Sequence, residues 1–359
     1  MKLKLKNTAE QIELVKAMGS RDNAVAAEAN QAFAAFLGPV VAKVLMQAAT
    51  ASAIYTDLPY DEDDRPSIPL DLWFDGGEGY VTTWSQNVAG GLPTSTVEGF
   101  SEMKVATYRL DSAVSFLKRY ARRGRLDVVS KAVERMANEV LVKQERNAWA
   151  VALKTLAESG NVLNTDETTV TFTLDILNRL MTQVKRINRS YAGGTTTDAY
   201  GLTDIFVSPE VKEDIRSFAY QPVSVTTTAN ALPTNNVLTN LPDAVREDIY
   251  RNAGTQEIYG VSIHDLIELG AGQKYNTLFA EFYTAGTFTA GSDELIVGLD
   301  LTKDAFVRPV ARQAESGGTF TALPDDQFAA RSEKIGFYGS LEEGRACVDS
   351  RAVHGVVIR

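Results

Sequence analysis

The side chains that most often carry catalysis or bind metals are scarce in this chain of 359 residues. His264 and His354 are the only histidines, and Cys347 is the only cysteine. His264 and Asp265 could form a base and the carboxylate that orients it, but neighbours along a strand point to opposite faces. No H-E-x-x-H motif is present to bind zinc. We therefore interpret both histidines as surface or hydrogen-bonded structural residues, and Cys347 as a buried, unreactive thiol.

Two patterns could bind a phosphate or use paired carboxylates. GAGQKYN (Gly270–Asn276) has two glycines and a lysine, but its spacing is wrong for a phosphate-binding loop, so a plain turn is expected. Glu342 and Glu343 are adjacent carboxylates that carry no information without a cleft. No P-loop, dinucleotide-binding or nucleophile-elbow motif occurs.

An acidic cluster could bind a hard cation such as calcium. It lacks the central glycine and the closing glutamate of an EF-hand, so a solvated linker or a contact to a basic neighbour fits it better. Its members are Asp57, Asp61, Glu62, Asp63 and Asp64. From these patterns we expect no catalytic residue, no metal ligand and no cofactor, and we do not expect an enzyme.

Charge is distributed unevenly along the chain. The net charge is -10, which argues against a protein that coats nucleic acid non-specifically. Yet residues 118–154 contain ten Lys/Arg and only four Asp/Glu. Five of the ten basic residues lie in LKRYARRGR (Leu117–Arg125). This basic run is either a solvated helix face or a contact surface for phosphates or for an acidic segment of another subunit.

Composition indicates a soluble globular protein, with 44% hydrophobic and 23% charged residues. No run of about 18 apolar residues predicts a membrane span, and the first residues lack the pattern of a secretory signal. One cysteine allows no intrachain disulfide, which fits a cytoplasmic origin.

Helical periodicity is clearest after Gly124. Apolar residues from Leu126 to Val140 recur at spacings of three and four, and Ser159-Gly160-Asn161 should end the helix. At about 1.5 Å per residue this helix would reach roughly 50 Å, which suggests a spine on which other parts are hung. Residues 1–50 are expected to be helical in pieces, with a kink or split at Gly38-Pro39.

The remaining elements alternate without βαβ regularity, so the fold class is α+β. A second amphipathic helix is expected at Thr173–Asn188, and a strand followed by a helix that Ser208 caps at Asp204–Phe218. Further strands are expected in Ile258–Leu269 and Asp293–Arg312, and the closing GVVI should be a core strand.

The segment Gly77–Leu110 raises a different question, because it reads as a ribbon that cannot cover itself. Two strand-like runs, Tyr80–Gln86 and Met103–Leu110, flank a Gly/Pro/Thr/Ser tip of about fifteen residues. An isolated two-stranded ribbon is at best marginally stable in water, so another surface must cover it. Its sparse large apolar residues are Tyr80, Trp84, Leu92 and Phe100.

This order of elements resembles the major capsid proteins of tailed bacteriophages, the Hong Kong ninety-seven fold. GYVTTWSQNVAGGLPTSTVEGFSEMKVATYRL is similar to the extended loop of that family, and RLDVVSKAVERMANEVLVKQERNAWAVALKTL to its spine helix. IFVSPEVKEDIRSF and IYGVSIHD resemble parts of the axial domain, and DAFVRPV and AVHGVVI strands that return to the peripheral domain. The resemblance covers nearly the whole chain, as element order and short patterns rather than as one diagnostic motif.

The resemblance implies five segments. These are an N-terminal arm and connector (1–75), an extended β-ribbon loop (76–112), a peripheral domain with the spine helix (113–165), an axial domain (166–298) and a return to the peripheral domain (299–359). It also implies a subunit that self-assembles, as pentamers and hexamers, into an icosahedral shell enclosing double-stranded DNA without sequence-specific binding. Scaffolding, portal and decoration proteins would be further partners, and the protein would reside in the virion after assembly in the host cytoplasm.

Two other functions stay open, an encapsulin-type compartment and a soluble enzyme with an unrecognised site. Some capsid proteins of the family cross-link the loop through a lysine and an asparagine, but no lysine lies between Gly77 and Met103, so this chemistry is not expected here. The candidate subunit-contact residues are Tyr80, Trp84, Leu92 and Phe100 in the loop, Arg122 and Arg123 opposite Asp63 and Asp64, and Phe33 and Phe36 in the arm.

Overall fold

The computed structural model describes residues 8–48, 53–61, 65–70, 101–165, 171–187, 201–217, 247, 257–302, 304–312, 320–325 and 333–359. The chain divides into two compact units, each built from two stretches of sequence. Unit 1 comprises Met1–Ala148 and Phe306–Val348, and unit 2 comprises Trp149–Ala305 and Asp349–Arg359. Helix α4 (Leu126–Ser159) contributes its first part to unit 1 and its second part to unit 2. The division into arm, extended loop, peripheral and axial domains stays a prediction.

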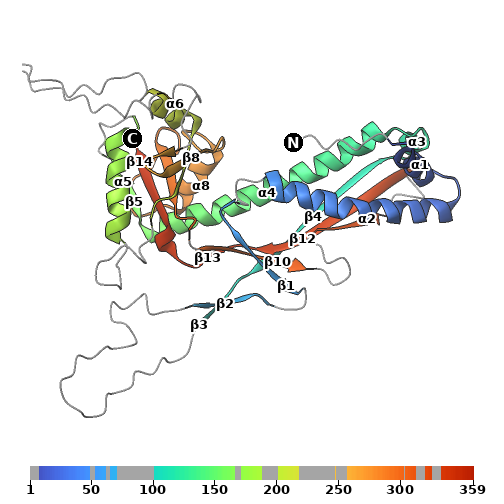
Figure 1. Cartoon of the computed structure of the whole chain (residues 1–359), viewed down its shortest axis with the longest axis horizontal. Helices are drawn as coiled ribbons and strands as arrows, with labels where there is room; N and C mark the ends of the chain where they lie inside the picture. Colours follow the sequence, from blue (N-terminus) through green and yellow to red (C-terminus); the bar gives the residue numbers. More distant parts are fainter. Residues whose placement is uncertain are drawn as a thin grey trace, which may run out of the picture. The chain divides into compact units, whose positions relative to one another are not determined.

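Unit 1 is a sheet with helices packed against it (Figure 1). Strand β12 is central: it pairs with β4 along its whole length, from Lys334↔Leu117 to Gly344↔Thr107. Its other edge meets β11 and β10, and β10 pairs in parallel with β1. The strands of this sheet are β1 (Thr56–Asp61), β4 (Thr107–Leu117), β10 (Phe306–Arg312), β11 (Thr321–Asp325), β12 (Lys334–Gly344) and β13 (Ala346–Cys347). The helices are α1 (Ala9–Met18), α2 (Asn23–Ala48), α3 (Lys118–Arg122) and the first part of α4.

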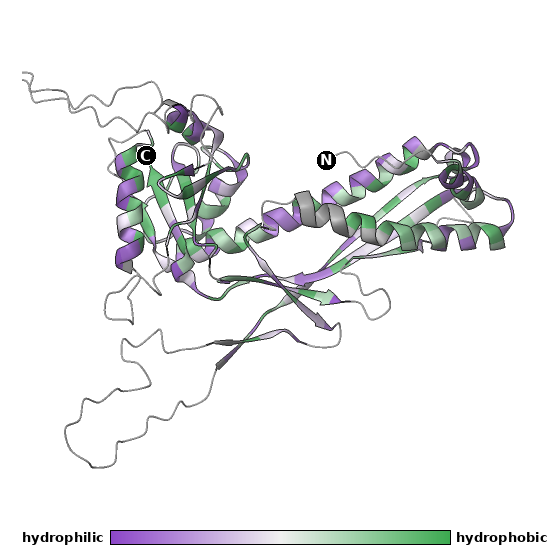
Figure 2. Cartoon of the chain, viewed as in Figure 1, coloured by the Kyte–Doolittle hydropathy of each residue, from purple (hydrophilic) through white to green (hydrophobic). Residues whose placement is uncertain are grey.

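The core of unit 1 forms where these helices meet one face of the sheet. Phe337 of β12 is fully buried and packs against Phe33 of α2 and Phe116 of β4, with ring centroids 5.2 and 6.2 Å apart. The predicted stripe of α4 faces the same core, and Figure 2 shows hydrophobic residues interspersed with polar ones along the strands of this sheet. The buried members of this stripe are Val129, Val133, Met136 and Val140.

Helix α2 differs from expectation at Gly38-Pro39. It runs without a break from Asn23 to Ala48, so the expected split there is wrong, and the chain divides instead between α1 and α2. Proline removes one backbone hydrogen bond. Residues on both sides of it, Leu37 and Val41, are buried in the common core, and tertiary packing supports the helix across the gap.

A second, smaller sheet belongs to the segment between β1 and β4. Strand β2 (Ser67–Leu70) pairs antiparallel with β3 (Ser101–Lys104), and these two strands are the whole of this sheet within the described residues. The strand expected at Met103–Leu110 is therefore shared between two sheets, with β3 ending at Lys104 and β4 beginning at Thr107. The strand expected at Tyr80–Gln86 lies outside the described residues.

Unit 2 is a six-stranded mixed sheet covered by helices. Its strand order is β5-β14-β9-β6-β8-β7. Buried residues of α5 and α6 pack with the sheet into one core, and Trp149 of α4 lies edge-to-face against Phe206 at 4.8 Å. The strands are β5 (Val162–Asn164), β6 (Asp204–Val207), β7 (Glu257–Ile258), β8 (Val261–Asp265), β9 (Glu294–Leu299) and β14 (Val353–Ile358). The helices are α5 (Leu174–Ile187), α6 (Pro209–Ser217), α8 (Lys274–Phe282), the second part of α4 and the 3-10 turn Ser350–Ala352.

Several local predictions are confirmed. Helix α4 spans Leu126–Ser159 with Asp127 in its first turn, and α5 spans Leu174–Ile187. The Ser208 hydroxyl accepts a hydrogen bond from the backbone N–H of Val211 at 3.2 Å, which caps α6 as expected. The mixed helix and sheet content agrees with the predicted α+β class.

Candidate functional site

The two histidines occupy different environments. His264 Nε2 lies 2.7 Å from Asp204 Oδ1, and its ring stacks on Phe206 at the surface of unit 2. Its sequence neighbour Asp265 pairs with Lys212 instead, because the two side chains leave β8 on opposite faces. His354 is 1% exposed, and burial lowers its pKa to about 4, so it is neutral at pH 7. His264 fits the surface role expected for it, whereas the expectation is wrong for His354, which is buried and has no hydrogen-bond partner for either ring nitrogen among the described residues.

The GAGQ turn does not offer its backbone to a phosphate. The N–H of Gly270 donates to Asn276 Oδ1, that of Ala271 to Glu294 Oε1, and that of Gly272 to the Ala290 carbonyl. These three amides are the groups that a phosphate would need. The turn interpretation is confirmed, with Gly270 and Gly272 at positive φ.

Among the described residues, no group of three or more His, Cys, Asp or Glu side chains is arranged to hold a metal. Asp57 of the acidic cluster forms an ion pair with Arg308 at 3.2 Å, and Asp61 at the end of β1 is exposed. Cys347, on the short strand β13, is partly buried rather than buried as expected. No helix in the described ranges has the length and apolarity to cross a membrane.

The candidate contact residues of the arm separate into two classes. Phe33 is 3% exposed and packs inside unit 1, whereas Phe36 is 46% exposed. Because Phe33 is already used within the subunit, a contact role for α2 rests on Phe36. The candidates Tyr80, Trp84, Leu92, Phe100, Asp63 and Asp64 lie outside the described residues.

The basic candidates lie at the end of α3. Arg123 is exposed and follows the last residue of that helix. Arg122 is also exposed, but its Nε donates to the carbonyl of Gly19 at 2.9 Å, which ties α3 to the end of α1. Within the described residues neither arginine forms an ion pair.

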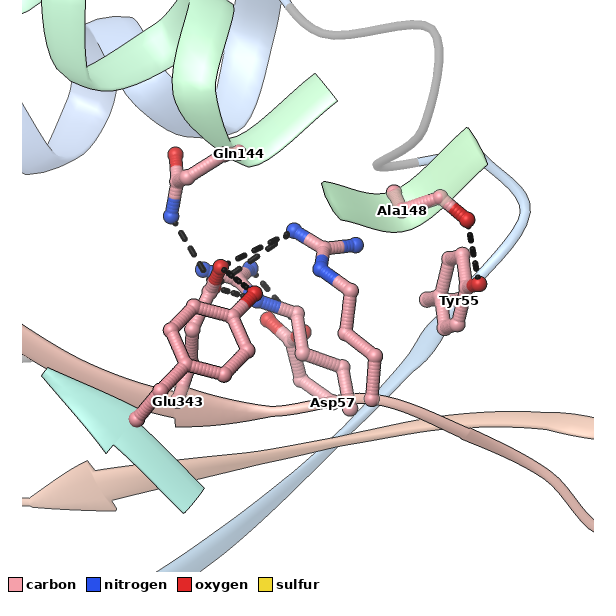
Figure 3. A network of polar contacts seen from close by, with 8 residues as sticks. Tyr55, Asp57, Gln144, Ala148 and Glu343 are labelled. Carbon is pink, nitrogen blue, oxygen red and sulfur yellow. Dashed lines mark hydrogen bonds and ion pairs between the residues drawn. The ribbon is translucent and has the colours of Figure 1, made fainter. Parts of the chain in front are cut away.

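The most organised polar site is a buried network around Glu343 of β12 (Figure 3). The Glu343 side chain has no exposed surface. Its Oε2 accepts from Arg308 Nε of β10 at 2.7 Å and from Gln144 Nε2 of α4 at 2.9 Å. Its Oε1 accepts from the Tyr108 hydroxyl of β4 at 2.8 Å and from Arg345 at 3.3 Å. One carboxylate thus joins α4 to three strands.

Opposite charges balance within this network. Burial opposes the charge on Arg345, but Glu343 and the nearby phenols outweigh it and raise the pKa of Arg345 above its ordinary value. Burial, and then the negative charge of Glu343, raises the pKa of Tyr108 to about 12, so this phenol stays a donor. Arg308 also pairs with Asp57, which gives two cations for two anions. A buried charge needs such pairing to be tolerated.

Tyr55, the residue immediately before β1, extends the network. Its hydroxyl donates to the Ala148 carbonyl of α4 at 2.8 Å (Figure 3). The guanidinium carbon of Arg345 lies 4.8 Å from the centroid of the Tyr55 ring. Burial raises the pKa of Tyr55, so its hydroxyl remains protonated. Because both carboxylate oxygens of Glu343 are occupied by donors, the group is not a free base, and the network is structural rather than catalytic.

This network is not among the features that the sequence predicts. Glu342 and Glu343 carried no signal because their partners lie far away in sequence: Gln144 is 199 residues and Tyr108 235 residues from Glu343. The one usable signal is a glutamate at a strand position that alternation assigns to the core, because buried glutamates are almost always paired.

No family model and no curated protein matches the sequence. The fold of the chain, however, is similar to that of solved structures. The capsid of cyanophage P-SCSP1u is similar with a TM-score of 0.54 and 10% identity, over 86% of this chain and 88% of that one. A structure from Microbacterium phage Oxtober96 gives 0.52 and 12%, over 86% and 90%. The mature capsid of bacteriophage PhiM1 gives 0.50 and 10%, over 87% of each chain.

Similarity over nearly the whole length at such low identity defines the fold. The chain has the fold of phage capsid proteins. This is the Hong Kong ninety-seven fold of tailed-phage major capsid proteins that the order of elements predicted.

Proposed function

We propose that this chain is the major capsid protein of a tailed bacteriophage. It assembles with copies of itself, as pentamers and hexamers, into an icosahedral shell that encloses double-stranded DNA. Its role is structural, and it resides in the virion after assembly in the host cytoplasm. Scaffolding, portal and decoration proteins are its further partners.

The observation that carries this proposal is the β2–β3 ribbon together with the capsid fold. Within the described residues the ribbon is a sheet of only two strands, formed by Ser67–Leu70 and Ser101–Lys104. Such a sheet is marginal in water unless another surface covers it. A neighbouring copy supplies that surface in a closed shell, where one contact is repeated by symmetry.

Electron microscopy of purified native particles tests the proposal. We expect closed shells of uniform diameter that contain double-stranded DNA, detected by nuclease digestion after the shells are opened. Shells that contain protein cargo and no nucleic acid would identify an encapsulin-type compartment instead. Protein that stays monomeric at high concentration would overturn the shell function and reopen the search for an enzyme.

Removal of residues 88–98 tests the contact itself. These residues belong to the tip expected between the two strands, and they lie outside the described residues. We expect a folded subunit with an unchanged unfolding midpoint that fails to form stable shells. Shells as stable as those of the full chain would refute the role of the extension. The control is a variant in which residues 88–98 are replaced by Gly and Ser. This variant keeps the length of the segment and removes its native side chains, so it separates the effect of length from that of side-chain contacts.

A further inference from the structure

The chain leaves and re-enters the main sheet of unit 1 at one carboxylate oxygen. Tyr60, near the end of β1, donates its hydroxyl to Glu342 Oε1 at 3.1 Å. Thr107, the first residue of β4, donates its hydroxyl to the same oxygen at 2.9 Å. Everything from residue 61 to 106, including the β2–β3 ribbon, lies between these two positions. Glu342 therefore closes the base of the whole extension.

The next residue holds the returning strand from the opposite face of the sheet. Successive side chains on a strand point to opposite faces. Glu343 accordingly points to the helix side, where it accepts from the Tyr108 hydroxyl at 2.8 Å and from Gln144 of α4 at 2.9 Å. The first two residues of β4 are thus fixed on both faces, Thr107 by Glu342 and Tyr108 by Glu343.

The third residue, Gly344, allows Val105 and Ala106 to pack closely against the backbone of β12. Gly344 pairs with Thr107 in the sheet. A Cβ at this position would lie 3.0 Å from the carbonyl oxygen of Ala106 and 3.0 Å from Cγ1 of Val105, closer than side chains normally approach. These two residues are the link between β3 and β4, and Val105 N–H donates to the carbonyl of Pro66, the residue immediately before β2.

We propose that Glu342, Glu343 and Gly344 are positioning residues that fix the direction in which the extension 61–106 leaves the subunit, and that assembly depends on this direction. The assembly part rests on the proposed function. A small rotation at the base moves the far end of an extension by a large distance. Ordering a loose extension during association would cost backbone conformational entropy, so a fixed base lowers the cost of assembly.

Isosteric variants test the anchor without disturbing the core. The double variant Tyr60→Phe with Thr107→Val removes both donors to Glu342 and keeps their shapes. Glu342→Gln keeps an acceptor oxygen and serves as the conservative rescue. Tyr338→Phe is the matched control, because Tyr338 donates to Asp111 on the same strands but away from the base of the extension.

Hydrogen exchange of unassembled subunits is the first measurement. In the double variant we expect exchange in residues 101–106 to rise at least tenfold, with exchange in the centre of β12 unchanged. Glu342→Gln and Tyr338→Phe should both stay within about twofold of the parent. If exchange in residues 101–106 does not rise, Glu342 is not an anchor, whatever the protein assembles into.

Assembly rate, followed by light scattering, is the second measurement. The double variant should assemble at least tenfold more slowly, and Gly344→Ala should assemble poorly without faster exchange, because it shifts the base rather than loosening it. Normal assembly of a variant whose exchange has risen would overturn the proposal. A parent protein that forms no shells at all would refute the proposed function, while the exchange result would still decide whether the anchor exists.

Discussion

Glu343 shows how much depends on a single buried carboxylate. It is enclosed by two arginines, a tyrosine and a glutamine, and Asp57 is the other anion of the group. Such a group gains little from being ionic, since two buried charges lose much hydration when they pair. Removing one partner is nevertheless expensive, because the others stay buried without compensation.

We therefore predict that Glu343→Gln, which keeps the shape and removes the charge, lowers the unfolding free energy of the subunit by about 3–5 kcal/mol. Urea titration followed by circular dichroism measures this. Asp111→Asn is the control, because it alters the exposed Arg109–Asp111 pair, which should contribute less than about 1 kcal/mol. Similar losses in the two variants would contradict the importance assigned to the buried network.

His354 makes unit 2 sensitive to acid. Burial holds its pKa at about 4, below the value of 6.5 expected when the chain is unfolded. Above pH 6.5 the His354 imidazole is neutral in both the folded and the unfolded chain, so it does not change the free energy of unfolding. As the pH falls from 6.5 to 4 the unfolded state takes up a proton that the folded state refuses, so stability decreases, by about 3 kcal/mol in all.

The measurement is the unfolding free energy at several pH values between 7 and 4. We predict that the unfolding free energy of His354→Leu falls less steeply with decreasing pH than that of the parent, because the buried imidazole is gone. His264→Gln, which alters the exposed histidine, should show the same pH dependence as the parent. An unchanged pH dependence in His354→Leu would show that the buried imidazole is not its source.

At the scale of elements, α2 carries two kinds of apolar residue. Phe33, Leu37 and Val41 lie in the core, at 3% exposure or less. Phe36 and Val25 are 46% and 44% exposed on the same helix. An exposed phenylalanine on a helix that already has a buried stripe is surplus to the subunit's own folding, so a neighbouring copy is the surface that we propose for it.

We predict that Phe36→Ser changes the subunit's unfolding free energy by less than about 0.5 kcal/mol and reduces assembly. Phe33→Ala should instead destabilise the isolated subunit by about 3–5 kcal/mol, since it opens a cavity in a close-packed core. Denaturation of the two variants, with assembly followed by sedimentation, separates the roles. Unimpaired assembly of Phe36→Ser would remove Phe36 from the contact surface.

At the scale of the whole molecule, negative charge is concentrated in one unit. Unit 2 contains 21 Asp/Glu against 13 Lys/Arg, a net charge of -8 out of the total of -10. The basic run Leu117–Arg125 belongs to unit 1. Complementary surfaces on different copies would steer subunits together and fix their register.

We predict that Arg123→Glu blocks assembly and that adding Asp63→Lys and Asp64→Lys partly restores it. Arg123 is the better single change, because reversal of Arg122 would also break its hydrogen bond to the Gly19 carbonyl. Assembly of each variant is followed at low and high salt, since screening should weaken the parent contact. Failure of the charge swap to restore assembly would exclude Asp63 and Asp64 and direct the search to acids of unit 2.

Features that depend on near neighbours can be predicted from the local amino-acid pattern. The periodicity of α4 and α5, their ends and the Ser208 cap are all encoded within one or two helical turns. The order of these elements was enough to predict the capsid fold. The split expected at Gly38-Pro39 failed because proline acts locally, whereas the helix is supported by core contacts on both sides of it.

Which remote groups meet depends on how the chain folds in three dimensions. Alternation along β12 assigns Glu342 and Glu343 to opposite faces, but it cannot name their partners, which lie up to 282 residues away. The pairing of His264 with Asp204 rather than with its neighbour Asp265 has the same origin. Local patterns fix the face on which a side chain lies, whereas the register between distant strands is set by how the whole core packs. The register between β12 and β4 places Glu342 beside Thr107 at the base of the extension.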